Sequence, residues 1–534
     1  MVTNVESDIL ILGTGGAGLR AAIEAMACGD SVVAVSKAPA GMNNATVVSG
    51  GGFRVAVRGL TPEEHLRDTI IVGKRVNNRR LVEVLAREGG EKVLELKRFG
   101  VEMTVGPGSI SVGSHPSLMG LGLTKPMVNY ARSQGVKFFE NIIVTKLLVD
   151  GGAVVGAVGY DAHNDQPIIF SSKAIVLATG GAAALYKRTD CPLRTTGDGY
   201  SLAYEVGAHL RDMEFVQFYP TALAEPRIPP YLLGGSIIEK GRIINSLGED
   251  IPMKHGVTAR PFVEKSRDLL SRAMMIEVLE GRGVDDAVII DATEVFSHII
   301  EESFFATTTY AFFRDKLKAA EKPFRIAPIC HFSMGGIITD EEGYTGIPGL
   351  YAAGEVVGGV HGANRQSGNA LTDIIVYGAH AGAAASRYAK TRNHVRVEST
   401  IEDELRRYER LRSCDEKEAI DPQVVMTKLR ETMWSKAGIV RDEDSLKEAI
   451  AAIVELNSAV TRLGASSGRM MMEVLEAPMA IKVAEMICQS ALERTESRGA
   501  HYRTDYPVED EDWLRAVVIR RDADGMMQIS TEPI

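Results

Sequence analysis

The chain has 534 residues, of which 45% are hydrophobic and 24% charged, and its formal net charge is -10. These values are typical of a globular protein with several folding units, and the spread negative charge argues against a nucleic-acid partner. No apolar run approaches about 18 residues and the first residues lack the features of a secretory signal, so we expect a cytoplasmic protein.

The five cysteines lie far apart and form no CxxC pair. This spacing predicts free thiols and neither a zinc site nor an iron-sulfur site within the chain. We therefore expect no metal.

The opening of the chain has the pattern of a strand, a glycine-rich turn and a helix. The apolar run DILIL (residues 8–12) precedes GTGGAG (13–18), and a second apolar run, SVVAVSK, ends at Ser36 and Lys37, about 20 residues after the glycines. Such glycines allow a tight turn and let a pyrophosphate approach the start of the helix. Ser36 and Lys37 stand where a nicotinamide-binding enzyme more often has an acid, which favours FAD.

Two later apolar runs also end in glycines, KAIVLATGG (173–181) and GLYAAGEVVGG (349–359). They are expected to join the first strands in one sheet, with an inserted lobe between them and amphipathic helices after it. The predicted parts are an FAD-binding domain (1–214 and 328–390), a capping domain (215–327), a helical C-terminal domain (391–505) and a C-terminal tail (506–534).

Longer strings point to one family. They are GMNNATVVSGGG, TTGDGYSLA, MEFVQFYPTAL, KSRDLLSR, ICHFSMGGI, GLYAAGEVVGGVHGANRQSGNALTD and RTESRGAHYRTDYP. Together they resemble the landmarks of succinate dehydrogenase and fumarate reductase flavoproteins, a family that includes L-aspartate oxidase. The resemblance implies an α/β fold, in which a Rossmann-type FAD-binding domain is interrupted by an α+β capping domain and followed by a helical domain.

The resemblance also implies a set of FAD-binding residues. They are Gly13, Gly15, Gly16, Ala17, Gly18, Ser36, Lys37, Asn44, Gly50, Gly51, Ala178, Thr179, Gly180, Asp198, Glu355, Arg365, Ala370 and Leu371. Many family members bond the flavin covalently to a histidine, but this chain has Asn43 and Asn44 in that region. We therefore expect FAD to be bound non-covalently.

Reduction of an activated double bond needs a hydride donor, a proton donor and cations that bind the substrate's carboxylates. By resemblance, Arg365 and His331 bind a carboxylate, and Arg267 transfers the proton from the capping domain. Because an arginine is a poor acid in water, this role requires a relay, for which Glu239 is the candidate.

The opposite wall of the predicted substrate site departs from the family pattern. Tyr219 replaces a histidine and Leu233 replaces a threonine, so we expect one firmly held carboxylate and an altered second end. Fumarate and a larger unsaturated acid both remain open as substrates.

The predicted function is the catalytic flavoprotein subunit of a fumarate reductase or succinate dehydrogenase-like complex. An iron-sulfur subunit would carry the electrons, and any contact with the inner face of the membrane would be made through partner subunits. The alternatives are an L-aspartate oxidase and a flavin subunit that only relays electrons.

Overall fold

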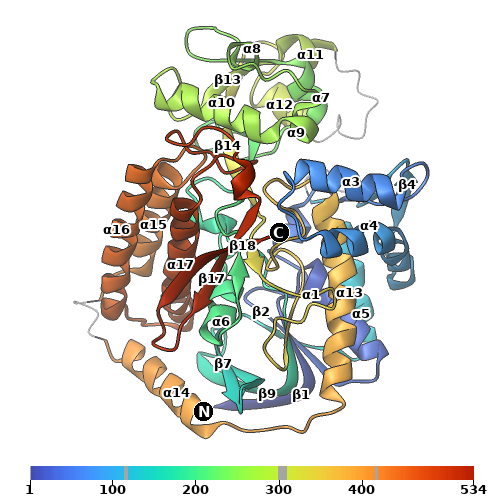
Figure 1. Cartoon of the computed structure of the whole chain (residues 1–534), viewed down its shortest axis with the longest axis vertical. Helices are drawn as coiled ribbons and strands as arrows, with labels where there is room; N and C mark the ends of the chain where they lie inside the picture. Colours follow the sequence, from blue (N-terminus) through green and yellow to red (C-terminus); the bar gives the residue numbers. More distant parts are fainter. Residues whose placement is uncertain (1, 114–117, 299–308, 415–418) are drawn as a thin grey trace.

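The computed structural model describes residues 2–113, 118–298, 309–414 and 419–534. A capping lobe lies at one end of the long axis, above an α/β body that carries helices α15, α16 and α17 on one side (Figure 1). This arrangement confirms the predicted fold class.

The body is built on a seven-stranded sheet in the order β6-β2-β1-β9-β8-β7, with β16 paired to the end of β9. The strands β1, β2, β6, β9 and β16 are parallel, whereas β7 and β8 form an antiparallel extension. Helices cover the parallel part, which explains its nearly unbroken apolar runs. The strands are β1 (Thr3–Leu12), β2 (Val32–Ser36), β6 (Lys137–Glu140), β7 (Ile142–Asp150), β8 (Ala153–Asp161), β9 (Gln166–Leu177) and β16 (Leu350–Ala352).

Helices α1 and α13 pack against each other and, with α4 and α5, bury a core that includes Ile9, Ile11 and Ile375. A small sheet in the order β3-β5-β4 lies beside them. The elements are α1 (Gly16–Ala27), α2 (Ala45–Val48), β3 (Gly52–Arg54), α3 (Pro62–Val72), α4 (Arg79–Leu94), η1 (Glu95–Phe99), β4 (Met103–Gly106), β5 (Ser109–Val112), α5 (Leu121–Ser133) and α13 (Asn369–Ala389).

The capping lobe has its own four-stranded antiparallel sheet, in the order β11-β14-β13-β12, and its own core. Strand β14 runs across the predicted boundary at residue 327 and reaches into the body. Its elements are β11 (Val216–Leu223), α7 (Gly235–Lys240), β12 (Arg242–Ile244), α8 (Ile251–Lys254), α9 (Phe262–Lys265), α10 (Arg267–Leu279), β13 (Val288–Asp291), α11 (Thr293–His298), α12 (Thr309–Asp315) and β14 (Phe324–Ser333).

Helices α15, α16 and α17 of the C-terminal part begin at polar caps, whereas α14 follows Val397 and has no side-chain cap. Asp421, Asp442 and Ser467 each accept a hydrogen bond from a backbone N–H in the first turn, which satisfies a donor that has no partner within the helix. The helices are α14 (Glu398–Arg412), α15 (Pro422–Lys436), α16 (Glu443–Ala459) and α17 (Gly468–Glu493), with short η3 (Val460–Arg462) and η4 (Glu511–Trp513).

The residues predicted as a tail contain a β-hairpin that pairs with a strand of the body, giving a sheet in the order β15-β10-β17-β18. Its strands are β10 (Leu210–Arg211), β15 (Gly336–Ile337), β17 (Arg515–Arg521) and β18 (Met527–Pro533). The hairpin therefore ties the C-terminus to the FAD-binding body.

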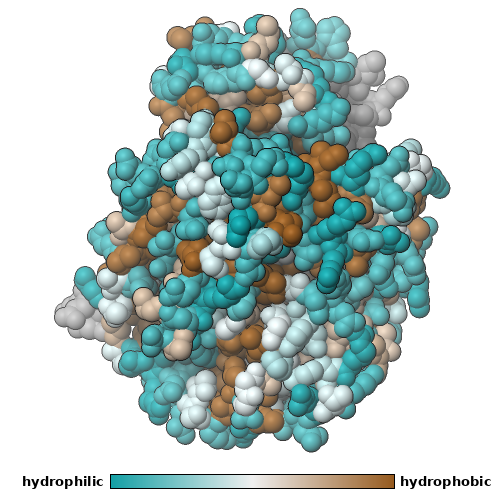
Figure 2. Space-filling view, viewed as in Figure 1, coloured by the Kyte–Doolittle hydropathy of each residue, from teal (hydrophilic) through white to brown (hydrophobic). Residues whose placement is uncertain are grey.

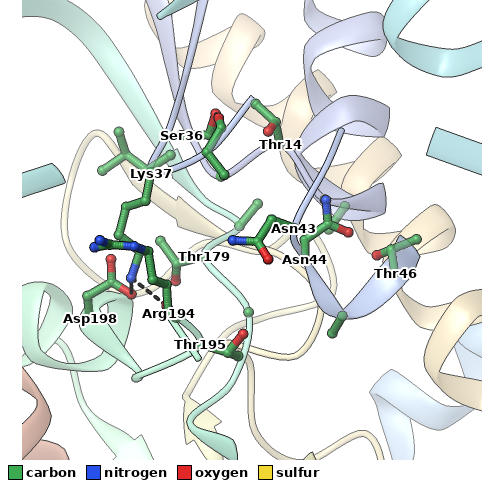
Figure 3. Close-up of a pocket in the computed structure, with 18 of the residues that line it drawn as sticks. Thr14, Ser36, Lys37, Asn43, Asn44, Thr46, Thr179, Arg194, Thr195 and Asp198 are labelled. Atoms are coloured by element: carbon green, nitrogen blue, oxygen red, sulfur yellow. Dashed lines mark hydrogen bonds and ion pairs between the residues drawn. The ribbon is translucent and has the colours of Figure 1, made fainter. Parts of the chain in front are cut away.

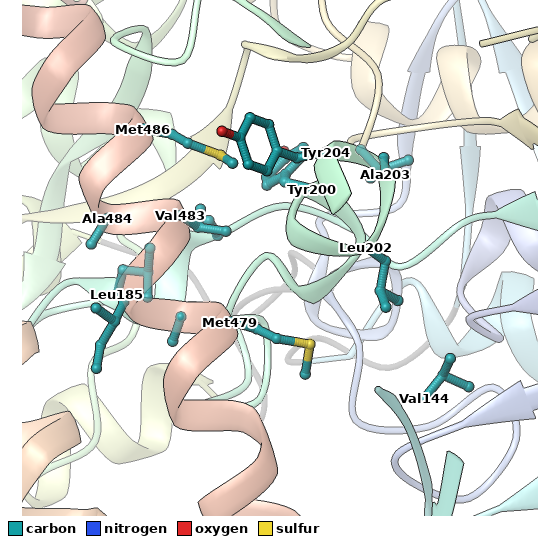
Figure 4. Close-up of a cluster of buried hydrophobic side chains, with 14 of the residues drawn as sticks. Val144, Leu185, Tyr200, Leu202, Ala203, Tyr204, Met479, Val483, Ala484 and Met486 are labelled. Atoms are coloured by element: carbon teal, nitrogen blue, oxygen red, sulfur yellow. The ribbon is translucent and has the colours of Figure 1, made fainter. Parts of the chain in front are cut away.

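Helix α17 packs against α6 (Asp198–Glu205), which follows η2 (Ala183–Leu185) in the chain. Met479 and Val483 of α17 belong to one buried cluster with Leu202 and Tyr204 of α6 (Figure 4). This apolar contact fixes the two helices to each other and brings their N-terminal halves towards one cavity.

The surface in Figure 2 is mainly hydrophilic, with apolar residues interspersed. In the described part of the chain, no helix is long and apolar enough to cross a bilayer.

Candidate active site

A large cavity lies at the carboxyl ends of β1, β2 and β9 and holds about 1000 Å³ of empty space, including space open to solvent (Figure 3). This position, at the carboxyl ends of parallel strands, is where open α/β sheets bind their ligands. The predicted FAD-binding residues that line it are Gly13, Gly15, Gly16, Ala17, Ser36, Lys37, Asn44, Ala178, Thr179, Gly180, Asp198 and Glu355.

The glycine-rich turn is closely packed against its neighbours. Gly13 has a φ of +108°, and a Cβ there would lie 2.1 Å from the carbonyl oxygen of Ala178. A Cβ at Gly18 would lie 1.9 Å from the carbonyl oxygen of Gly13. Gly18 does not line the cavity. Its missing side chain instead lets α1 approach β1, as the third glycine of such a turn does.

The remaining predicted FAD-binding residues do not line this cavity. Gly50 and Gly51 lie between α2 and β3, whereas Ala370 and Leu371 lie in the first turn of α13 and Arg365 precedes that helix. Their cofactor contacts stay predictions.

One end of the cavity is charged. Lys37 Nζ lies 3.1 Å from Asp198 Oδ1 and donates to the carbonyl oxygen of Arg194 (Figure 3). It also lies 2.7 Å from Glu476 Oε1. Burial alone would lower the pKa of Lys37, but the two carboxylates raise it above its usual value. Lys37 is therefore a fixed cation at the wall of the cavity.

Sequence analysis missed Glu476 and Arg194. Glu476 comes from α17, 439 residues after Lys37, and no motif marks either residue. The C-terminal domain thus completes a charged group at the wall of the FAD-binding cavity, where the packing of α17 on α6 places it.

Other features of the lining fit a bound dinucleotide. Thr179 Oγ1 and Arg194 Nη1 are buried and have no hydrogen-bond partner in the described structure. Helix α1 begins at Gly15 without a side-chain cap and has no acid in its first turn, so its N-terminus suits a pyrophosphate. These groups are the ones that would hold the phosphates and polar rim of FAD.

Two further residues lie along the cavity lining. Asn44 caps α2, and its Oδ1 accepts a hydrogen bond from Val47 N. Glu355 accepts one from Ser333 N, and burial raises the pKa of this carboxyl to about 7. Glu355 is thus held in the cavity lining by its hydrogen bond to the end of β14.

The predicted catalytic arginines meet at one amide. Gln217 Oε1, on β11, lies 2.7 Å from Arg267 Nη1 and 3.1 Å from Arg365 Nε. The other side of this amide, Gln217 Nε2, donates to Asn364 Oδ1 and to the carbonyl oxygen of Arg365. Gln217 was not predicted, although it lies in the string MEFVQFYPTAL that carries part of the family resemblance.

Both guanidiniums are buried, with 4% of Arg267 and 7% of Arg365 exposed. Burial, followed by the nearby charge of Arg267, lowers the pKa of Arg365 to about 9. Burial also lowers the pKa of Arg267. In the part of the chain that is described, neither guanidinium is recorded in an ion pair with a carboxylate, although Glu355 and Asp190 lie close enough to favour the charged form of Arg365.

His331 lies on β14 beside this pair. Its Nδ1 is 2.6 Å from Asp190 Oδ2, and its ring centroid is 5.7 Å from that of Tyr219. Burial lowers the pKa of His331. The charges of Arg365 and Arg267 lower this pKa further, whereas the Asp190 carboxylate raises it. Asp190 was missed because it precedes the TTGDGYSLA string and belongs to no motif.

The opposite wall is arranged differently from the expectation. Tyr219 donates its hydroxyl to the carbonyl oxygen of Leu233 at 2.9 Å, so this phenol is already used within the capping lobe. Leu233 is 1% exposed and packs in the core of that lobe. Burial raises the pKa of Tyr219 to about 12, so the phenol stays neutral.

Glu239 does not contact Arg267. Its carboxylate accepts hydrogen bonds from Arg260 Nη1, at 2.9 Å, and from Phe262 N, whereas Arg267 bonds Gln217 and the carbonyl oxygen of Val263. A relay from Glu239 to Arg267 therefore has no direct hydrogen bond in this structure, and the prediction requires an intervening group.

Among the residues described, no cluster of three or more histidines, cysteines or acids could hold a metal ion. No disulfide bond joins any of the cysteines, all of which lie in the described residues.

Comparison with known proteins agrees with this site. Residues 8–371 match the family described as FAD binding domain, so the chain is an FAD-binding flavoprotein. Residues 426–534 match the family described as fumarate reductase flavoprotein C-term.

Relatives cover nearly the whole chain. It is 32% identical to one subunit of the fumarate reductase (CoM/CoB) of Methanothermobacter marburgensis, with 97% of both chains covered. It is 29% identical to an L-aspartate oxidase of Streptomyces coelicolor, over 99% of this chain and 93% of the other. The quinol fumarate reductase FrdA of E. coli superimposes with a TM-score of 0.89 at 26% identity, over 100% of this chain and 97% of that chain.

The chain belongs to the fumarate reductase and succinate dehydrogenase flavoprotein family and is an FAD-dependent oxidoreductase acting on CH–CH bonds. The predicted family, fold, cofactor and class of reaction are thereby confirmed.

Proposed function

We propose that this flavoprotein reduces the C=C bond of fumarate or of a related unsaturated carboxylate. The observation that carries this proposal is the pair of buried guanidiniums, Arg267 and Arg365, which converge on the neutral oxygen of Gln217 without a carboxylate partner in the described structure. Such a pair is costly to bury unless an anion completes it, and a substrate carboxylate would do so.

Bound FAD would supply the hydride, that is, both electrons of the reduction. Arg365 and His331 would hold a carboxylate and withdraw electrons from the double bond, while Arg267 would deliver the proton to the other carbon. Burial assists the last role, because it lowers the pKa of Arg267 and brings the guanidinium closer to the range of a useful acid. Hydride and proton together saturate the double bond.

The wall formed by Tyr219 and Leu233 should determine which group is accepted at the second end of the substrate. Because the Tyr219 hydroxyl is bonded to Leu233, that wall offers the substrate an aromatic ring in place of a free donor. A larger or less polar group than the second carboxylate of fumarate would therefore be accepted there.

We further propose that FAD is held without a covalent bond, since the side chains at residues 43 and 44 are amides that cannot form one. Precipitation with acid should release all of the flavin into the supernatant. Yellow colour remaining with the precipitate would contradict this.

Several relatives are named as subunits, among them those of a fumarate reductase and of a succinate dehydrogenase, and we propose that an iron-sulfur protein is the electron-transfer partner of this chain. In the described residues this chain offers no ligand cluster of its own. Any association with the inner face of the membrane from the cytoplasm would then depend on partner subunits.

The function is tested with the FAD-containing enzyme after chemical reduction. Fumarate, larger unsaturated acids and a saturated acid as control are added in turn, and reoxidation is followed by the return of flavin absorbance. Reoxidation by an unsaturated acid supports the proposal. Silence throughout would favour a flavoprotein that only relays electrons, and reduction of oxidised enzyme by L-aspartate would favour an L-aspartate oxidase.

A further inference from the structure

Asp190 is a carboxylate beside His331 that has no role in the reaction proposed above. Its Oδ2 lies 2.6 Å from His331 Nδ1, and only 12% of the Asp190 side chain is exposed. The backbone holds it there, because Asp190 N donates to the carbonyl oxygen of Cys330 and Cys330 N donates to that of Arg188. The acid is thus fixed alongside β14.

The contact with Asp190 defines what each nitrogen of His331 can do. An ionised carboxylate only accepts hydrogen bonds, so Nδ1 must carry a proton. Nε2 has no hydrogen-bond partner in the described structure, and 23% of the His331 side chain is exposed. Nε2 is therefore the ring atom available to a substrate.

The charges that face His331 have opposite effects on it. Burial, Arg365 and Arg267 disfavour the protonated ring, whereas Asp190 favours it, and the net effect is a lowered pKa of His331 in the free site. The neighbouring phenol of Tyr219 stays neutral. A bound carboxylate would compensate the two arginines, so that the anion and Asp190 together favour the protonated ring against the effect of burial. The free and occupied sites then favour different protonation states of the ring.

We propose that Asp190 and His331 form a pair that takes up one proton from solvent when a substrate carboxylate binds. Asp190 acts as a positioning residue that holds Nδ1–H, and the added proton resides on Nε2, from which it is donated to the carboxylate. This inference rests on the proposed function in one respect, namely that a carboxylate binds beside Arg365. It also explains how a site containing a fixed acid can still attract an anion.

The test uses calorimetry of malonate binding to the oxidised FAD-containing enzyme, since malonate is a dicarboxylate without a reducible double bond. Titrations near pH 7.5 in buffers of different ionisation enthalpy give the number of protons taken up. We expect about one proton for wild type and for the exposed control variant Asp403→Asn, and close to none for Asp190→Asn.

The variant His331→Gln distinguishes proton uptake by this pair from proton uptake by Glu355, a nearby carboxyl whose pKa is raised to about 7. It should abolish uptake although Glu355 is still present, and adding Asp190→Asn to it should change nothing further. Equal uptake in wild type and Asp190→Asn would overturn the inference.

The wild type provides a second measurement that does not depend on any variant folding correctly. Coupled uptake requires the Kd for malonate to rise with pH between about 6 and 8.5, by up to about tenfold per pH unit. A flat Kd, or no malonate binding, overturns the inference. Proton uptake without reoxidation by any unsaturated acid would instead refute the proposed function alone.

Discussion

Gln217→Glu would place a negative charge where the side chains of Arg267 and Arg365 converge. Gln217 Oε1 is 2.7 Å from Arg267 Nη1 and 3.1 Å from Arg365 Nε, so the new carboxylate would pair with both. A substrate carboxylate bound to the same guanidiniums would lie within about 5 Å of it, where repulsion at an effective dielectric constant of about 20 amounts to ~3 kcal/mol. This energy corresponds to roughly 100-fold weaker binding.

The assay is steady-state reoxidation of reduced enzyme by fumarate, or by the most active acid of the panel, together with thermal unfolding. KM should rise by about two orders of magnitude, whereas Tm should not fall, because the buried guanidiniums gain a counter-ion. Gln423→Glu makes the same change of charge at an exposed position on α15 and should leave KM unaltered. A KM for Gln217→Glu within threefold of wild type would refute the view that this amide marks the anion site.

Three further predictions concern the arginines and the charged end of the cavity. Arg267→Ala should retain FAD absorbance but lose at least about 100-fold in kcat, since the proton donor is absent; an unchanged rate would remove Arg267 from the reaction. Because the pKa of Arg365 is lowered to about 9, its charge is present below that pH and lost above it, so substrate KM should rise above about pH 9, and a flat profile to pH 10 would contradict this assignment. Lys37→Met leaves Asp198 and Glu476 without their shared cation, which should cost about 3 kcal/mol of unfolding free energy and reduce the FAD retained after gel filtration; undiminished Tm and FAD content would show that the three charges are not coupled.

The local patterns of the sequence were sufficient for the cofactor fold. A buried strand, a glycine turn and a helix are specified by neighbouring residues. Gly13 and Gly18 are needed because a Cβ at Gly13 would meet the backbone of Ala178 and one at Gly18 would meet the backbone of Gly13. The resemblance added Arg267, His331 and Arg365, and the structure places the two arginines on one amide and the histidine beside them. Their catalytic roles remain predictions.

Other parts of the site depend on contacts between distant segments. Glu476 reaches Lys37 only because α17 packs on α6, and Asp190 reaches His331 only because its loop pairs with β14. Likewise, the Tyr219 hydroxyl donates a hydrogen bond to the carbonyl oxygen of Leu233, a contact that the residue types alone could not reveal. The sequence by itself determined the backbone frame of the cofactor site and the identity of its cations, because these depend on local geometry and residue type. Only the tertiary structure decided which acids and amides face these cations, because each partner lies on a separate element of the fold.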